Sequence, residues 1–548
     1  MVFFSNNYNY DIIIVGGGIS GLFIGYKLSE LNQKILILES SSILGGRIKT
    51  EYKNDDVYFE SGAARFHKKH SKLLSLINEL DLQDNINELN SEIDYNILGS
   101  KDNVMVDIFN NLNEAIKKKD LSKKKLMNIT FYQYLILLFD FKTAEHIKAS
   151  FGYDSEFMHL NAYAAIRMFK DDLFKGGPYY SLKGGLTQII LKLEEILDQK
   201  KNVTIIKECS LKEVYSNHII TVEDDQFNFK NLILTIPSEK IEGLEYFKDN
   251  ELIRSVKPFP LLRIYAQYST TNLWFKDIKR TITDNYIRQI IPIDYDKGLI
   301  MLSYTDDIYS KMWESYGTIS NTFLIKALHK EIQELFDIQP PKPKMISTHY
   351  WDNGIHMWKT GYDIDEVYKS LLKPNGSDNI YIAGESFSKK QGWIEGSLET
   401  SYDVIKMLDL NGIKAYSSKS NINIKLNKKG GVEEGGEEDG ETLLLKNKSL
   451  KKYSLKEVNN KKNWIILDHN GKLPIYNLSE WIKRHPGGDI IKKGIEANNY
   501  YDITKRKMYP RTPYDIFNSL HSKEVFDKYI LNENQFIKQM GYLNKTKV

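Results

Sequence analysis

Residues 10–50 read YDIIIVGGGISGLFIGYKLSELNQKILILESSSILGGRIKT, and this stretch decides the fold. The run Ile12–Val15 is β-branched throughout, which is typical of a strand buried on both faces of a parallel sheet. It leads into the pattern G-x-G-x-x-G, whose glycines are Gly16, Gly18 and Gly21. Helical spacing over 22–31 and a second apolar run over 35–38 complete a strand–helix–strand unit.

The three glycines and the acid after the second strand indicate what this unit binds. Gly16 permits a tight turn, Gly18 lets the backbone approach a pyrophosphate, and Gly21 lets the helix pack closely on the strand. The N-terminus of the helix offers free N–H groups and its dipole to the phosphates. Glu39 can accept hydrogen bonds from both hydroxyls of an adenosine ribose. The unit therefore predicts a dinucleotide site.

The loop after Glu39 indicates which dinucleotide binds. Gly45, Gly46 and Arg47 resemble the FAD-binding fingerprint of the flavin amine oxidase superfamily, in which the arginine contacts the pyrophosphate and flavin side. The alternative is a surface glycine turn with a solvated arginine. We expect FAD.

Two further segments resemble the same family. Ala63 and Arg65 lie in a stretch that looks like the G-A-x-R segment under the flavin, although Arg65 could instead have a purely structural partner. Val203 lies in a run that looks like the strand holding the adenine through backbone contacts.

A C-terminal motif completes the resemblance, at Tyr381–Glu385 and Gln391–Glu399. Gly384 allows close backbone approach, and Glu385 can hydrogen-bond the pyrophosphate–ribitol region. The helix that begins near Ile394 would point its N-terminus at the flavin pyrimidine, where reduction places negative charge.

The resemblance implies an α/β fold with a discontinuous FAD-binding, Rossmann-like domain interleaved with a mixed α+β substrate domain. The flavin region spans 1–415. Within it, the FAD domain covers about 1–95, 180–256 and 375–415, and the substrate domain about 96–179 and 257–374.

The expected catalytic strand departs from the family pattern. Many relatives carry a lysine that holds a water against flavin N5, but Arg263 stands at the matching position. Arginine cannot adopt the neutral form of a buried lysine, and its fork prefers a carboxylate or phosphate. Arg263 therefore indicates either an anionic substrate group or a structural carboxylate partner.

His356 and Trp358 lie in a segment that resembles the substrate wall, and either would face Trp393 across the substrate side of the flavin. Both could instead be core packing. Some relatives bond the flavin covalently to a cysteine in this region, which holds none here, so we expect non-covalent FAD.

Residues 416–454 read as a flexible acidic linker, with an acidic interaction motif as the alternative. Residues 455–548 resemble a small α+β cytochrome b5-like domain. The resemblance implies haem b, with iron bound by His485 and His521 and electron transfer as its role. These histidines stand further apart in the chain than is usual, with an apparent insertion through Thr504–Pro513, and His469 is the weaker candidate for the second ligand.

Composition limits the partners and the location. The 75 Lys+Arg nearly balance the 72 Asp+Glu, giving a net charge of +3, so we expect no nucleic-acid partner. Cys209 is the single cysteine, which excludes structural disulfides within the chain and favours a reducing compartment. Without a signal peptide or an apolar run long enough to span a bilayer, we expect a cytoplasmic protein, or a virion protein if it is viral.

These observations predict an FAD-dependent oxidoreductase that oxidises the C–N bond of a small-molecule amine or amino acid. The electron acceptor would be O2 or a redox partner. The reduced flavin could also pass electrons to the haem. One alternative is a desaturase or porphyrinogen-type oxidase. Another is a non-catalytic flavin- and haem-binding structural component, because the residue bias resembles giant-virus amine-oxidase-like proteins.

Overall fold

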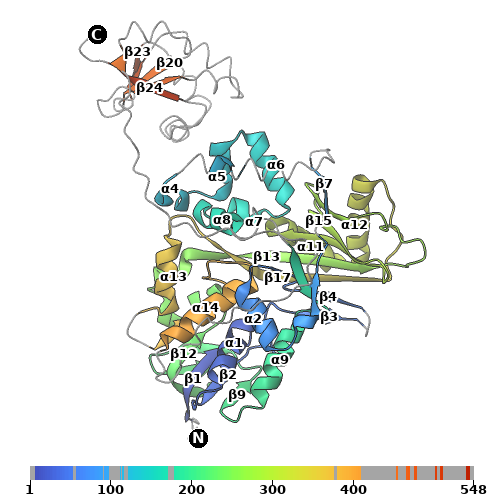
Figure 1. Ribbon diagram of the computed structural model, residues 1–548, viewed down its shortest axis with the longest axis vertical. Coiled ribbons are helices and arrows are strands. Elements are labelled where there is room, and N and C mark those ends of the chain that lie inside the picture. Colours follow the sequence, from blue (N-terminus) through green and yellow to red (C-terminus); the bar gives the residue numbers. More distant parts are fainter. Residues whose placement is uncertain are drawn as a thin grey trace, which may run out of the picture. The chain divides into compact units, whose positions relative to one another are not determined.

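The structure is a computed structural model of the chain, shown in Figure 1. It describes residues 7–53, 57–90, 92–97, 112, 114–116, 121–170, 178–375 and 379–408, and the backbone of short strands further on. The chain divides into two compact units. The first unit consists of Met1–Leu135 and Phe141–Ile422, and the second consists of Ile136–Asp140 and Asn423–Val548.

A seven-stranded sheet forms the base of the first unit. Its strands are, in order, β10 (Leu211–Val214), β11 (His218–Thr221), β12 (Gln226–Leu234), β1 (Asn7–Val15), β2 (Ile35–Leu38) and β9 (Val203–Ile206), with β18 (Ile380–Ile382) also paired to β12. β1 runs parallel to both β12 and β2, and Ile12, Ile13 and Ile14 have no exposed surface. The β-branched run is thus buried on both faces, as the sequence predicts.

Three helices pack on this sheet: α1 (Ile19–Leu28), α9 (Thr187–Asp198) and α14 (Ile394–Met407). Leu22, Ile189 and Leu398 share one buried cluster with the sheet, and Figure 1 shows the three helices beside β1 and β2. α1 begins earlier than the apolar spacing predicts, because the Leu22 N–H bonds to the Gly18 carbonyl oxygen at 3.0 Å. The predicted α/β fold is therefore confirmed for this part of the chain.

A six-stranded sheet forms the second layer of this unit. Its strands are, in order, β17 (Met345–Trp358), β13 (Val256–Gln267), β16 (Leu299–Asp306), β15 (Gln289–Asp294), β14 (Arg280–Thr283) and β7 (Ile93–Asn96). Leu262 and Ile264 of β13 pack with α11 (Asp307–Ile319) and α12 (Asn321–Phe336) in a second core. The long antiparallel pair β13 and β17 places Arg263 opposite His349.

Smaller elements complete the unit. The helices are α2 (Ser71–Glu79), α4 (Lys123–Met127), α5 (Phe131–Leu138), α6 (Phe141–Phe151), α7 (Ser155–Met158), α8 (Ala162–Met168), α10 (Ser238–Glu242) and α13 (Ile364–Leu372), with 3-10 turns at Gln83–Asn85, Glu245–Phe247 and Glu251–Ser255. The remaining strands are β3 (Thr50–Tyr52) paired with β4 (Tyr58–Glu60), and β8 (Tyr179–Leu182) between β5 (Phe66–His67) and β6 (Ile86–Glu88).

The second unit contains one six-stranded sheet. Its strands are, in order, β19 (Lys452–Tyr453), β24 (Lys538–Leu543), β21 (Pro474–Asn477), β20 (Trp464–Asp468), β22 (Tyr500–Asp502) and β23 (Lys507–Tyr509). His469, His485 and His521 lie outside the described residues, and so does the expected linker apart from β19.

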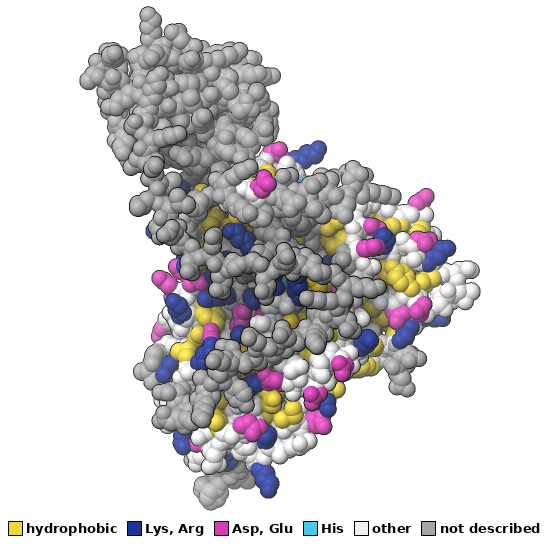
Figure 2. All heavy atoms as spheres, viewed as in Figure 1, with side chains coloured by type: hydrophobic (Ala, Val, Ile, Leu, Met, Phe, Trp, Pro, Cys, Tyr) yellow, Lys and Arg dark blue, Asp and Glu magenta, His cyan; other side chains and the backbone are white. Residues whose placement is uncertain are grey.

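Surface charge and helix length bear on the expected partners. Figure 2 shows Lys or Arg side chains interspersed with Asp or Glu over the coloured part of the visible face, as the near-zero net charge predicts. Among the helices that the structure describes, none is long and apolar enough to cross a bilayer.

Candidate active site

The glycine turn between β1 and α1 has the geometry that a pyrophosphate requires. Gly16 has a φ of +113°, which favours glycine, and a Cβ on Gly21 would overlap the Gly16 carbonyl oxygen. A Cβ on Gly18 would meet no protein atom within 4 Å. Gly18 is therefore not required by packing within the protein, and a ligand passing over it is the remaining reason for a glycine there.

Glu39 and the second glycine pair surround the same turn. The Glu39 carboxylate accepts hydrogen bonds from the Gly17 N–H at 2.7 Å and the Ser41 N–H at 2.8 Å. The Gly45 N–H donates to the Gly17 carbonyl at 2.9 Å, and a Cβ on Gly46 would lie 3.6 Å from the Gly18 Cα. The glycine turn after β1 and the glycine pair in the loop after Glu39 are thus in direct contact, although they are separated in the sequence.

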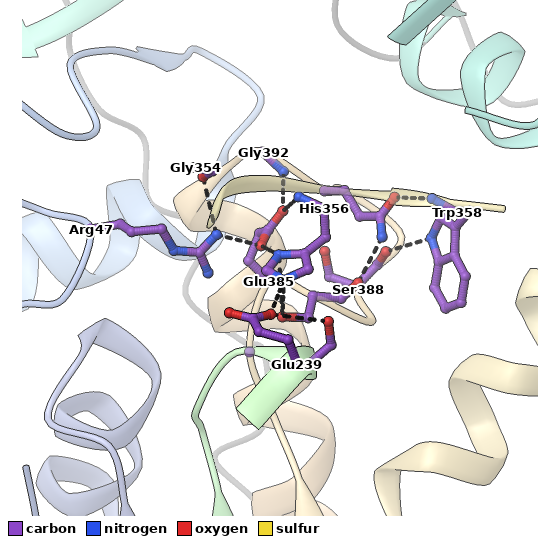
Figure 3. A network of polar contacts seen from close by, with 12 residues as sticks. Arg47, Glu239, Gly354, His356, Trp358, Glu385, Ser388 and Gly392 are labelled. Carbon is purple, nitrogen blue, oxygen red and sulfur yellow. Dashed lines mark hydrogen bonds and ion pairs between the residues drawn. The ribbon is translucent and has the colours of Figure 1, made fainter. Parts of the chain in front are cut away.

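Arg47 joins the N-terminal fingerprint to the C-terminal motif, as Figure 3 shows. Its Nη1 lies 2.7 Å from Glu385 Oε2 and also donates to the Gly354 carbonyl at 3.2 Å. The other oxygen of Glu385 accepts the Gly392 N–H at 2.8 Å. Burial opposes the charge of Glu385, but Arg47 and His356 outweigh it and hold the pKa of this carboxyl well below its usual range.

His356 belongs to this network of polar contacts. The ring is fully buried, with Nδ1 2.7 Å from Glu385 Oε2 and Nε2 3.3 Å from Glu239 Oε2. Burial opposes a positive charge, yet the two carboxylates raise the pKa of His356. Both ring nitrogens are thus engaged within the protein.

Trp358 is likewise part of the core. It is 1% exposed, its indole N–H donates to the Ser388 carbonyl at 3.0 Å, and its backbone N–H donates to Gln391 at 2.9 Å. These contacts and the burial of Trp358 are those of a core residue, the alternative that the sequence left open.

Trp393, the N-cap residue of α14, has different aromatic neighbours among the described residues. His70 packs edge-on at 4.9 Å between ring centroids, and Tyr179 stacks at 6.1 Å. The Arg65 guanidinium lies 4.8 Å from the centre of the Tyr179 ring. Burial, and then the charges of Lys390 and His67, lower the pKa of His70 to about 3, so His70 is neutral. Motif reasoning missed His70 and Tyr179, although Tyr179 directly precedes a segment that resembles the family.

Arg263 is 8% exposed and is held by oxygen atoms that carry no formal charge. Its Nη1 donates to the carbonyls of Glu60 (2.9 Å) and Gly62, and its Nη2 donates to the Tyr304 hydroxyl at 3.0 Å. Among the residues that the structure describes, no carboxylate lies within ion-pair distance of Arg263, so the structural-carboxylate alternative is not what is observed.

The structure also describes the remaining residues that the sequence predicts to bind the cofactor. Ala63 donates its N–H to the Arg47 carbonyl at 2.9 Å. Val203 begins β9 beside Ile35 of β2, and Gly384 has a φ of +134°. Ile394 is the first residue of α14.

These residues fit FAD as its expected site. A glycine at position 18 that the protein itself does not require, an acid after β2 and a helix N-terminus at each cofactor motif are the donor and acceptor groups that a dinucleotide uses. No cluster of three or more metal-ligating side chains occurs in the described part of the chain.

Residues 19–404 match the family model described as flavin containing amine oxidoreductase, and the chain belongs to this family. It is 22% identical over 472 residues to the flavin-dependent L-tryptophan oxidase RebO of Lentzea aerocolonigenes, covering 73% of this chain and 98% of that protein. It is also 22% identical over 499 residues to an uncharacterized protein of Acanthamoeba polyphaga mimivirus, covering 74% and 96%.

Solved structures share the fold. A redesigned putrescine oxidase superposes with a TM-score of 0.60 at 15% identity, over 73% of this chain and all of that one. A putative protoporphyrinogen oxidase from Exiguobacterium sp. 255-15 gives a TM-score of 0.58 at 18% identity, over 73% and 98%.

Proposed function

We propose that the first unit is an FAD-dependent oxidase of amines that carry a carboxylate, most concretely of an α-amino acid. The observation that carries this proposal is Arg65. Its guanidinium packs on Tyr179, which stacks on Trp393, and in the described part of the chain no carboxylate lies within ion-pair distance of it. A cation without an acidic partner, beside the expected flavin wall, suits a substrate carboxylate.

The side chains of this site have distinct roles in the proposal. Bound FAD would supply the acceptor for a hydride from the substrate α-carbon. Arg65 would hold the substrate carboxylate in a two-point contact, and the faces of Trp393 and Tyr179 would orient the carbon chain. Neutral His70 adds no charge that would repel a substrate ammonium. The L-tryptophan oxidase among the relatives supports this substrate class.

Arg263 would have a supporting role near the flavin. Its guanidinium spans the carbonyls of Glu60 and Gly62, next to the segment expected under the flavin, and its charge is permanent. It would therefore contribute a fixed positive charge, where a lysine of the family could lose a proton.

We propose that FAD is bound without a covalent link. Cys209, the single cysteine, is buried, and its N–H bonds to the Glu39 carbonyl at 2.9 Å, on the adenine side of the expected site. Acid precipitation should then release all of the flavin, and flavin that stays with the pellet would contradict this.

The test of the proposed function is anaerobic bleaching of the flavin by a panel of amino acids, their decarboxylated amines, polyamines and a porphyrinogen. Reduction by amino acids well above the matching amines supports the proposal. Reduction by the porphyrinogen alone would favour the porphyrinogen-type alternative, which buried arginines could serve by binding propionate groups. Stoichiometric FAD that no compound reduces would favour a non-catalytic role.

For the second unit, we propose haem b bound by His485 and His521. The support is the H-P-G-G run at His485–Gly488, which resembles the haem-ligand motif of cytochrome b5 domains. The three strand segments that also resemble this family, at 464–467, 471–476 and 541–543, adjoin because β21 pairs with both β20 and β24. A low-spin bis-histidine spectrum of the haem-reconstituted full chain should be lost in His485→Ala and in His521→Ala. Loss in His469→Ala with retention in His521→Ala would contradict the assignment.

A further inference from the structure

Arg280, the first residue of β14, is a partly buried cation that the proposed reaction does not use. Its Nη2 donates to Gln289 Oε1 at 2.9 Å, and its Nε is buried without a hydrogen-bond partner in the described part of the chain. Gln289 is fully buried and donates in turn to the Gly152 carbonyl at 3.4 Å. The Arg280 guanidinium is thus held through Nη2, and its Nε–H remains available as a hydrogen-bond donor.

Arg280 lies within the electrostatic influence of Arg65. Burial, and then the charge of Arg65, lower the pKa of Arg280 to about 10, so the two guanidinium groups repel each other. Tyr153, which directly follows Gly152, packs edge-on against Tyr304 at 5.0 Å and is close enough to feel the charges of Arg65, Arg280 and Arg263. The Arg263 guanidinium itself lies 4.4 Å from the centre of the Tyr304 ring, so the charges of three arginines act on this pair of tyrosines.

The acids of this region do not neutralise those arginines. Asp154 forms an ion pair with Arg288 at 2.9 Å, and Asp306 accepts the N–H groups of Asp154 and Ser155. Burial, with a contribution from Asp306, raises the pKa of Glu156 to about 8, so Glu156 is mostly protonated at neutral pH. Among the described residues, no carboxylate lies within ion-pair distance of Arg280.

Each arginine can be matched to one anion or anchor. Arg263 is held by the Glu60 and Gly62 carbonyls, and Arg65 is matched by the substrate carboxylate of the proposed function. Arg280 remains. The charge of Arg280 is partly buried and its Nε is unpartnered among the described residues, so a second anionic group is the natural partner.

We infer that Arg280 forms a second anion subsite beside Arg65, and that the substrate is an amino acid with a carboxylate in its side chain, of the aspartate or glutamate class. This inference rests on the proposed function for the α-carboxylate and the amine, and it adds the side-chain specificity.

The experiment compares the FAD-loaded full chain with Arg280→Gln, which keeps a donor and removes the charge, and with Arg280→Lys, which keeps the charge and removes the fork. Arg254→Gln is the matched control, because Arg254 makes exposed ion pairs with Glu242 and Glu251. Anaerobic flavin reduction is measured with glutamate, glutamine, aspartate, asparagine and leucine.

The inference predicts that wild type and Arg254→Gln prefer glutamate to glutamine, or aspartate to asparagine, by about 10- to 100-fold in reduction rate per substrate concentration. Arg280→Gln should abolish this preference, and Arg280→Lys should be intermediate. An acid preference absent from wild type, or unaffected in Arg280→Gln, would overturn the inference and leave the proposed function standing.

A second measurement does not depend on turnover. Glutarate and butyrate, which differ by one carboxylate, are titrated against the flavin absorption spectrum of each variant. Glutarate should perturb the wild-type spectrum at concentrations at least 10-fold lower than butyrate, and Arg280→Gln should remove that difference. This outcome would support the anion subsite even if no amino acid reduces the flavin, whereas equal titrations in wild type would refute it.

Discussion

Arg47, on one side, and Arg65 with Arg280, on the other, show two opposite arrangements around a partly buried positive charge. Arg47 lies 2.7 Å from Glu385, a carboxylate that also accepts hydrogen bonds from His356 and Gly392. Arg65 and Arg280 have no carboxylate partner among the described residues, and their charges repel each other. The first arrangement is complete within the protein and joins the two cofactor motifs. The second is incomplete, which indicates a place for an anion from outside.

The largest expected loss of stability tests the cofactor side of this comparison. Gly21→Ala puts a Cβ onto the Gly16 carbonyl oxygen, so the turn must shift, and we expect the apoprotein to lose more than about 4 kcal/mol. Gly18→Ala, where a Cβ meets no protein atom, should leave apoprotein unfolding unchanged and weaken FAD retention alone. Equal destabilisation by both substitutions in chemical denaturation would show that Gly18 has a packing role.

Arg47→Met should give the next largest effect. It leaves the buried Glu385 with one cationic partner, and because the Arg47 side chain is 31% exposed we expect a loss of about 3 kcal/mol and of bound FAD. Arg254→Met, at an exposed site, should be near neutral. An Arg47→Met protein that keeps both its FAD and its stability would show that the ion pair between Arg47 and Glu385 contributes to neither.

Glu60→Gln should change how stability depends on pH. Burial raises the pKa of Glu60 to about 7, against opposing hydrogen bonds from Leu186 and Thr50 and the charge of Arg263. A raised pKa means that the folded protein keeps a proton that the unfolded chain releases near pH 4.5. The contribution of Glu60 is fully present below pH 4.5 and is lost as the pH rises towards 7, by roughly 2–3 kcal/mol.

The measurement is apoprotein unfolding between pH 4.5 and 8. Glu60→Gln should flatten the decline, because the amide does not titrate and can still accept from the Leu186 N–H while donating to the Thr50 hydroxyl. A variant with the same slope as wild type would show that Glu60 does not titrate in this range.

Arg280→Met should have the smallest effect on stability. Removing an unmatched cation favours folding, but it also leaves the buried amide oxygen of Gln289 without its donor, so the free energy of apoprotein unfolding should fall by about 1 kcal/mol or less. A loss comparable to that of Arg47→Met would mean that Arg280 has an acidic partner within the protein, and the contrast between the two regions would fail.

The sequence predicted the backbone frame of the site better than its side-chain contacts. The glycines at 16, 18 and 21 and the acid at 39 have fixed spacings, because turn, helix and strand leave few geometries. The sequence assigned Arg47 and Glu385 to the same expected cofactor, and the structure brings the two side chains within 2.7 Å of each other, a contact that the sequence did not predict.

Side chains on the long strands were less predictable. His356 and Trp358 lie on β17, and their motif does not say that Glu385, Glu239 and Ser388 engage them inside the core. Arg280 and Tyr179 belong to no motif, and their importance arises only when β14 and β8 bring them beside Arg65. Such contacts depend on tertiary packing, which a one-dimensional pattern does not contain.

The central claim is that Arg65 serves the substrate while Arg47 serves the cofactor. The most direct measurement is the anaerobic rate of flavin reduction in Arg65→Met, compared between an amino acid that reduces the wild type and its decarboxylated amine. The account predicts full FAD occupancy, a rate with the amino acid lowered by about 100-fold or more, and an unchanged rate with the amine. An Arg65→Met enzyme that still prefers the amino acid as strongly as wild type would contradict it.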